Sequence, residues 1–159
     1  MSDSGTKGTA LITGASSGIG AVYADRLAKR GYNLVLVGRS EAQLKALSAR
    51  LTKETGRSVA PLRANLSDKA DLEKVESLLR ENQAITMLVN NAGIGAITPL
   101  LNTEVDMTDE MIALNITALT RLTYAAAPAF VARAAGTTIN IGPTFRKIGF
   151  GRPGCCLLL

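Results

Sequence analysis

The chain has 159 residues, an apolar fraction of 47% and a charged fraction of 19%, values that suit one folded domain and exclude a disordered or fibrous protein. Histidine is absent and only two cysteines are present, which excludes histidine-based triads, histidine-ligated metal sites and a cysteine-rich zinc site, and we expect no bound metal. The net charge is +5, but the last acidic residue is Glu110 and the basic excess follows it, so no basic surface points to nucleic-acid binding.

The N-terminal residues 1–8 are small and mostly polar, without the apolar stretch that a signal peptide needs. No apolar run approaches the roughly 20 residues that would span a bilayer. The sequence therefore predicts a cytoplasmic protein with reduced thiols and no membrane partner.

Short apolar runs alternate with stretches of helical periodicity along most of the chain. The predicted strands are residues 9–13, 33–37, 58–63, 85–90 and 137–141. The predicted helices are residues 18–30, a segment between the N-cap Ser40 and the terminating Gly56, residues 69–81 and residues 106–133. Strand–helix alternation with right-handed crossovers predicts an α/β protein with a doubly wound parallel sheet, which binds ligands beyond the carboxyl ends of its strands.

Three glycines follow the first predicted strand, in the run Thr-Gly-Ala-Ser-Ser-Gly-Ile-Gly at residues 13–20. Gly14 permits a tight turn, Gly18 leaves the backbone open to a phosphate, and Gly20 lets the helix pack close to the strand. The helix that begins near Gly18 offers N–H groups and the positive end of its dipole to a pyrophosphate. A glycine-rich turn without a ligand is the alternative interpretation.

The second predicted strand ends at Arg39 and Ser40, where an acidic residue would accept a hydrogen bond from a ribose 2′-hydroxyl. No acid is present. Arg39 can instead pair with a 2′-phosphate and Ser40 can donate to it, which favours NADP over NAD. The alternative is a solvated arginine at the start of a helix.

The fourth predicted strand ends in Asn90-Asn91-Ala92-Gly93. Two adjacent amides at a strand end can tie neighbouring loops together, and the small residues leave room for a flat ring. A plain Asn/Gly turn would have the same sequence.

Together these residues resemble the short-chain dehydrogenase/reductase family, of the classical type, over about residues 9–141. The resemblance rests on the glycine motif at 13–20, Asn-Asn-Ala-Gly at 90–93, Asn115 within Leu-Asn-Ile-Thr, and Ile-Asn-Ile at 139–141. It implies a Rossmann-like sheet with strand order 3-2-1-4-5, an NAD(P)-binding domain at residues 8–142 and an irregular tail at 143–159.

The resemblance also implies hydride transfer between NADP(H) and a small carbonyl or alcohol substrate. Asn65 and Leu66 would lie beside the adenine, where the family usually has an acid. Asn115 would hold a water of the proton relay, the alternative being a polar helix residue without a role. The residues expected to bind the cofactor are Thr13, Gly14, Ser16, Ser17, Gly18, Ile19, Gly20, Arg39, Ser40, Asn65, Leu66, Asn91, Ala92 and Gly93.

The family's proton donor, Tyr-x-x-x-Lys, is missing from this sequence. The residues four positions after Tyr23, Tyr32 and Tyr124 are Leu27, Leu36 and Pro128. The expected serine position falls at Pro143, which has no hydroxyl, with Thr144 shifted by one. We therefore expect a chain truncated or frame-shifted near Gly142, lacking the later strands and helices and inactive in this form.

A truncated sheet would expose its fifth strand as an apolar edge and uncover part of the long helix, which predicts marginal stability and self-association. The alternative function is a non-catalytic module that binds NADP(H). The ending Cys-Leu-Leu-Leu at 156–159 fits a prenylation signal, but any leucine-rich end after a cysteine would match it, and we favour a tail without a role.

Overall fold

The computed structural model describes residues 7–95 and 104–142. Its centre is a parallel sheet of five strands in the order β3-β2-β1-β4-β5, which confirms the predicted doubly wound topology. The strands are β1 Thr9–Thr13, β2 Asn33–Gly38, β3 Val59–Arg63, β4 Ile85–Asn90 and β5 Thr137–Asn140. The predicted irregular tail lies outside the described residues.

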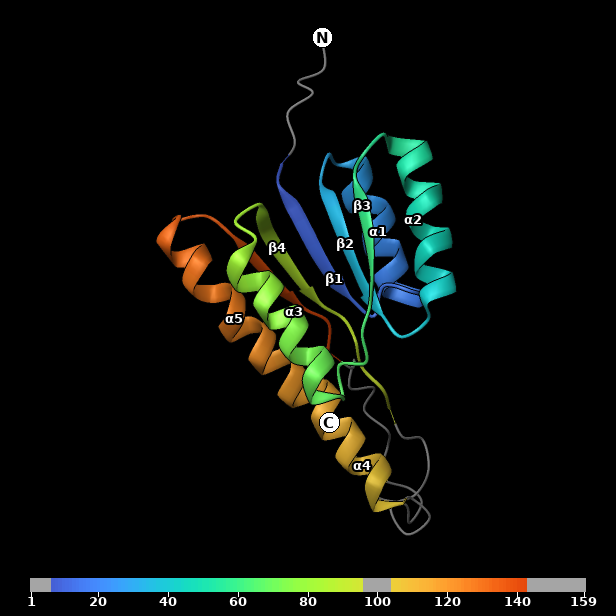
Figure 1. Cartoon of the computed structure of the whole chain (residues 1–159), viewed down its shortest axis with the longest axis vertical. Coiled ribbons are helices and arrows are strands. Elements are labelled where there is room, and N and C mark those ends of the chain that lie inside the picture. The colour runs from blue at the N-terminus through green and yellow to red at the C-terminus, as the bar shows by residue number, and fades with distance from the viewer. Residues whose placement is uncertain (1–6, 96–103, 143–159) are drawn as a thin grey trace, which may run out of the picture.

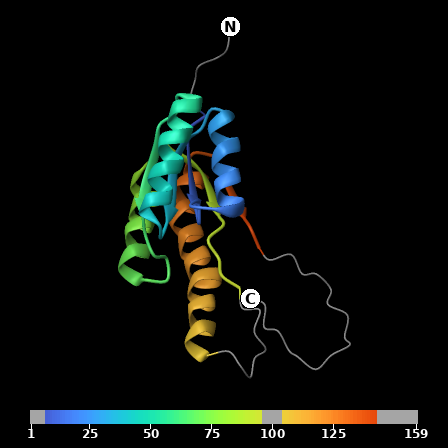
Figure 2. The same ribbon diagram turned by 90° about the vertical axis from the view of Figure 1, so that its right-hand side faces the viewer.

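Helices cover both faces of the sheet. The helices are α1 Gly18–Lys29, α2 Glu41–Thr55, α3 Lys69–Glu81, α4 Val105–Ile112 and α5 Leu119–Ala132, with the π-helical segment η2 Ala113–Ala118 joining the last two. Helices α1 and α2 lie on one face, and α3 and α5 lie on the other (Figures 1 and 2). All these elements begin and end within one residue of their predicted bounds.

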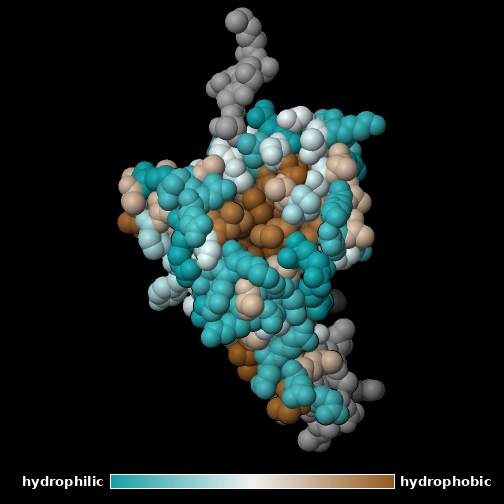
Figure 3. Space-filling view, in the orientation of Figure 1, coloured by the Kyte–Doolittle hydropathy of each residue, from teal (hydrophilic) through white to brown (hydrophobic). Residues whose placement is uncertain are grey.

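The strand residues divide between two apolar cores because successive side chains point to opposite faces. Ile12 and Leu36 pack with the α1 and α2 residues, whereas Leu11 and Val37 pack with the α3 and α5 residues. Figure 3 shows apolar side chains gathered over β1 and β2, between α3 and α2. The continuous apolar character of the central strands therefore follows from burial on both faces.

The edges of the sheet are β3 and β5. In β5 the exposed side chains are Thr137, Thr138 and Asn140, and Ile139 is half-buried. The expectation of an apolar edge strand is therefore met only at Ile139. The predicted exposed apolar surface lies on the long helix instead, where Tyr124 and Val131 are each 78% exposed.

The predicted single helix over residues 106–133 is continuous, but its middle winds as a π-helix over Ala113–Ala118. Such segments hold one residue more per turn than an α-helix and are frequent at functional sites. The segment contains Asn115, so the local change of winding affects how that residue faces the loop after β4.

A buried carboxylate fastens α3 to the long helix. The Glu76 side chain is 3% exposed and accepts hydrogen bonds from Arg80, at 2.6 Å, and from Arg121 of α5. Burial by itself would raise the pKa of Glu76, but the bonds from Arg121 and Arg80 outweigh it and the pKa is lowered. Glu76 is therefore ionised and holds the long helix in place.

We expect Glu76→Gln to lower the free energy of unfolding by about 1–3 kcal/mol at neutral pH, because two charge-assisted hydrogen bonds lose their ionised acceptor. Since the folded-state pKa is lowered, this contribution is complete above the unfolded-state pKa and is lost as the pH falls through the folded-state pKa. Urea unfolding at a series of pH values should show the difference between variant and wild type shrinking in acid.

The matched control is Glu73→Gln on the same helix, whose carboxylate lies 4.0 Å from Lys69 in an exposed pair. It should change stability by less than about 0.5 kcal/mol. Equal losses in the two variants would contradict the assigned role of Glu76.

Candidate functional site

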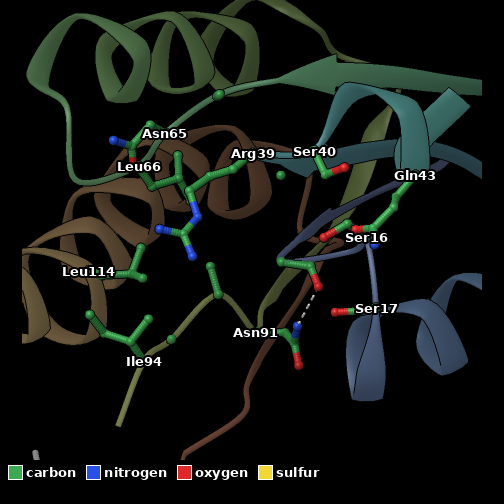
Figure 4. Close-up of a pocket in the computed structure, with 15 residues that line it drawn as sticks. Ser16, Ser17, Arg39, Ser40, Gln43, Asn65, Leu66, Asn91, Ile94 and Leu114 are labelled. Carbon is green, nitrogen blue, oxygen red and sulfur yellow. Dashed lines mark hydrogen bonds between the residues drawn. The ribbon is translucent and has the colours of Figure 1, made fainter. Parts of the chain in front are cut away.

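The carboxyl ends of β1, β2 and β4 open onto a cleft of about 420 Å³ (Figure 4). It lies where the order of the sheet reverses between β1 and β4, the position at which such sheets bind ligands. The residues lining it are Gly14, Ser16, Ser17, Gly38, Arg39, Ser40, Gln43, Ala64, Asn65, Leu66, Asn91, Ala92, Gly93, Ile94 and Leu114.

Glycines shape the turn from β1 into α1. Gly14 has φ +63°, and a Cβ there would lie 2.9 Å from the Cα of Ala92. A Cβ on Gly20 would collide with the carbonyl oxygen of Gly14, so only glycine lets α1 start this close to the turn. Gly18 has φ +55° and nothing within 4 Å of its virtual Cβ, which leaves its backbone open on that side.

Thr13 and Asn91 lock this turn to the loop after β4. The Thr13 hydroxyl accepts hydrogen bonds from the N–H groups of Asn91 and Ala92, both at 2.9 Å. The Asn91 amide in turn donates to the carbonyls of Thr13, at 3.0 Å, and Gly14, at 3.1 Å (Figure 4). Thr13 is itself buried and does not line the cleft, so its observed contacts are with the protein.

Asn90 also lies outside the cleft. Its buried amide donates to the Thr123 hydroxyl at 3.1 Å and to the Asn140 side chain at 3.0 Å. These bonds join the end of β4 to α5 and to β5. Asn91 therefore joins the two loops of the cleft, and Asn90 joins the sheet to the long helix.

Asn115 faces the loop that forms one rim of the cleft. Its side-chain oxygen accepts from the Ile94 N–H at 3.0 Å, and its amide donates to the Ile94 carbonyl at 2.8 Å. A Cβ on Gly93 would come within 3.1 Å of the same side-chain oxygen. The Asn115 side chain thus holds the loop against the π-helical segment, and its relay role stays a prediction.

Asn65 and Leu66 lie on the cleft in the loop between β3 and α3. Asp71 accepts from the Asn65 N–H at 2.9 Å, and the Asn65 side chain accepts from the Ser67 N–H at 3.3 Å. The hydrogen bond from Lys74, and next the one from Asn65, lower the pKa of Asp71. An ionised Asp71 therefore fixes the backbone of the predicted adenine contact.

Arg39 reaches into the cleft from the end of β2. Its guanidinium lies 3.6 Å from the carboxylate of Glu110 on α4. Ser40 occupies the N-cap of α2, as predicted, but its side chain makes no capping hydrogen bond. Both side chains line the same part of the cleft as Gln43, which the sequence analysis missed. Gln43 lies in the first turn of α2, three residues after Ser40, and that helical spacing was the available signal.

Two further lining residues were not foreseen. Ile94 directly follows the Asn-Asn-Ala-Gly motif, and Leu114 lies in the π-helical segment of the long helix. Ile19 does not line this cleft: it is 58% exposed and lies with Gly18 on a second groove beside Met87 and Ile139. Gly20 is buried in the turn. The remaining predicted cofactor residues are brought together on one cleft.

Over residues 7–95 and 104–142, no cluster of acidic, cysteine or histidine side chains is arranged to hold a metal ion. Over the same residues, no helix combines the length and apolar character needed to cross a membrane.

The chain matches the short chain dehydrogenase family over residues 8–151. Because this match covers most of the chain, the protein belongs to that family, which confirms the resemblance read from the sequence.

Among curated proteins, the chain is 37% identical over 145 residues to the very-long-chain 3-oxoacyl-CoA reductase of Pyrenophora tritici-repentis, covering 86% of this chain and 42% of that protein. The structure of the bulky-bulky ketone specific alcohol dehydrogenase from Comamonas testosteroni has a TM-score of 0.86 at 43% identity, covering 88% of this chain and 56% of that one. The short-chain dehydrogenase from Sphingobium yanoikuyae, in complex with NADPH, has a TM-score of 0.85 at 49% identity, covering 86% and 54%. The chain thus spans about half the length of these proteins.

We expect Gly14→Ala to destabilise the fold more than Gly56→Ala. The two glycines have similar φ values, +63° and +68°, so both variants force an alanine into the left-handed region, at about 1–2 kcal/mol. A Cβ on Gly14 would also press against the backbone of Ala92, whereas one on Gly56 would meet no atom within 4 Å. The overpacking at Gly14 should add about 1–3 kcal/mol to the loss of stability. Thermal unfolding followed by circular dichroism measures both, and equal melting temperatures would show that the contact between the two loops is not tight.

Proposed function

We propose that this chain is an oxidoreductase by family descent whose cleft binds NADP(H), the cofactor of hydride transfer to or from a carbonyl or alcohol substrate. The observation that carries the proposal is the Arg39 guanidinium in the cleft at the end of β2, together with a lining that, among the residues the structure describes, holds no acidic residue for a ribose 2′-hydroxyl. A cation at this position favours a 2′-phosphate and hence NADP over NAD.

The residues of the cleft fit such a cofactor. The first turn of α1 leaves N–H groups without intrahelical acceptors, and the turn at Ser16 and Ser17 brings two hydroxyls beside them. Arg39 and Ser40 would hold the 2′-phosphate, and Asn65 and Leu66 would contact the adenine. When bound, the reduced cofactor supplies a hydride. The residues of this chain bind it, orient it and limit the access of water to it.

Proteins similar to this chain support the same chemistry. The Sphingobium yanoikuyae dehydrogenase is a complex with NADPH, and the Comamonas testosteroni enzyme is named as a ketone specific alcohol dehydrogenase. The Pyrenophora tritici-repentis protein is named as a 3-oxoacyl-CoA reductase. These names share oxidation or reduction at a carbonyl carbon, and we propose the same substrate class here without a choice among them.

Cofactor binding without turnover is the second candidate function. The sequence favours it because none of its three tyrosines is followed, four residues later, by the lysine that would lower the pKa of the phenol. Self-association belongs with either function. It is supported by the exposed apolar side chains of the long helix, Tyr124 and Val131 among them. The cytoplasmic location stays a prediction from the sequence.

We expect Arg39→Ala to weaken NADPH binding by about 10- to 100-fold, because the 2′-phosphate loses a charge-assisted pair, and to change NADH binding much less. Fluorescence titration of the two reduced cofactors measures both. Arg30→Ala, which removes the same charge at the C-cap of α1, away from the cleft, is the control and should leave both affinities unchanged.

Titration with NADPH and an assay of carbonyl reduction on the same sample separate the two candidates. Binding without turnover supports the module, and turnover supports the enzyme. If turnover survives substitution of both Thr144 and Asn115, then neither a Thr144 hydroxyl in place of the family's serine nor the relay role predicted for Asn115 is required. A failure to bind either cofactor would overturn the proposed function as a whole.

A further inference from the structure

One ion pair joins a residue of the cleft to the long helix. Arg39 follows β2 and lines the cleft, and Glu110 lies on α4. Over residues 7–95 and 104–142, the other ion pairs join residues within a helix or between helices packed on the same face of the sheet. A ligand that binds Arg39 would therefore meet the carboxylate of Glu110 as a competitor.

Figure 4 shows where the guanidinium lies. The Arg39 side chain extends away from Ser40 into the cleft and toward Leu114, not toward Ser16 and Ser17. Glu110 precedes Leu114, which lines the cleft, by four residues or about one helical turn. The cation proposed to bind a 2′-phosphate is thus paired with a carboxylate of the long helix.

We propose that Glu110 tunes cofactor selection by competing with the 2′-phosphate for Arg39. This inference rests on the proposed function, since it concerns the same cleft. Without a 2′-phosphate, the guanidinium pairs with Glu110 of the long helix. A 2′-phosphorylated ligand takes Arg39 from the carboxylate, and it can do so because a guanidinium–phosphate pair is bidentate and more highly charged.

The size of the competition follows from the exposure of the pair. The Arg39 side chain is 65% exposed and that of Glu110 42%, with 3.6 Å between the charged atoms. Exposed pairs of this kind are weak, so the carboxylate lowers the affinity for a 2′-phosphate without preventing its binding. Removing the carboxylate should tighten binding of a 2′-phosphorylated ligand by about two- to five-fold.

The test compares 2′,5′-ADP with 5′-ADP, two fragments that differ in the 2′-phosphate. Isothermal titration calorimetry is run on the 159-residue chain as wild type, Glu110→Gln, Arg39→Ala and the double variant. We expect Glu110→Gln to tighten 2′,5′-ADP by about two- to five-fold and 5′-ADP by less. In the Arg39→Ala background the same substitution should have almost no effect, and this loss is the signature of direct competition.

Asp109→Asn is the matched control, because it removes the same charge from the next residue of α4, and this aspartate makes no ion pair within residues 7–95 and 104–142. It should not tighten binding. If Glu110→Gln fails to fold, Glu110→Asp replaces it: the shorter side chain draws the carboxylate back from Arg39, and an intermediate gain is expected.

Three results would overturn the inference while leaving the proposed function intact. They are unchanged or weaker 2′,5′-ADP binding in Glu110→Gln, an equal gain in Asp109→Asn, and a gain that persists without Arg39. If neither the wild type nor any variant binds either fragment, the proposed function fails and the inference fails with it.

Discussion

The cleft depends on the hydrogen bonds that Thr13 and Asn91 make. Thr13 ends β1 and Asn91 directly follows β4, the two strands between which the order of the sheet reverses. Their bonds to each other, and those to Gly14 and Ala92, join the two loops at 2.9–3.1 Å. The contact brings the Gly14 turn against Ala92 so closely that a side chain there would not fit. These polar contacts give the turn after β1 one geometry.

The other wall of the cleft is the long helix, and three contacts set its position. Glu76 joins it to α3 through Arg121, Asn90 joins it to β4 through Thr123, and Asn115 holds the loop at Ile94 against its π-helical segment. The walls thus come from separate layers of the fold. Arg39, which follows β2, and Glu110 on the long helix form an ion pair between these layers.

The described residues gather the features of the proposed cofactor site on one cleft: the turn after β1, the cation at the end of β2 and the amide-rich loops. In contrast, no tyrosine of the sequence is followed four residues later by a lysine. The chain also spans about half the length of the relatives it matches.

The sequence by itself determined the strands and the helices, because burial on two faces leaves a periodic signature that is local in the chain. The sheet order came from the resemblance to a known family and not from periodicity. The sequence also identified Gly14 and Gly20 as required glycines, because a side chain at either position would collide with neighbouring backbone. The orientation of particular side chains was decided only by the tertiary structure. Thr13 turns inward to residues 78 and 79 positions away, and Arg39 crosses to Glu110. Such contacts join segments that no periodicity relates, so only the packing of the layers could decide them.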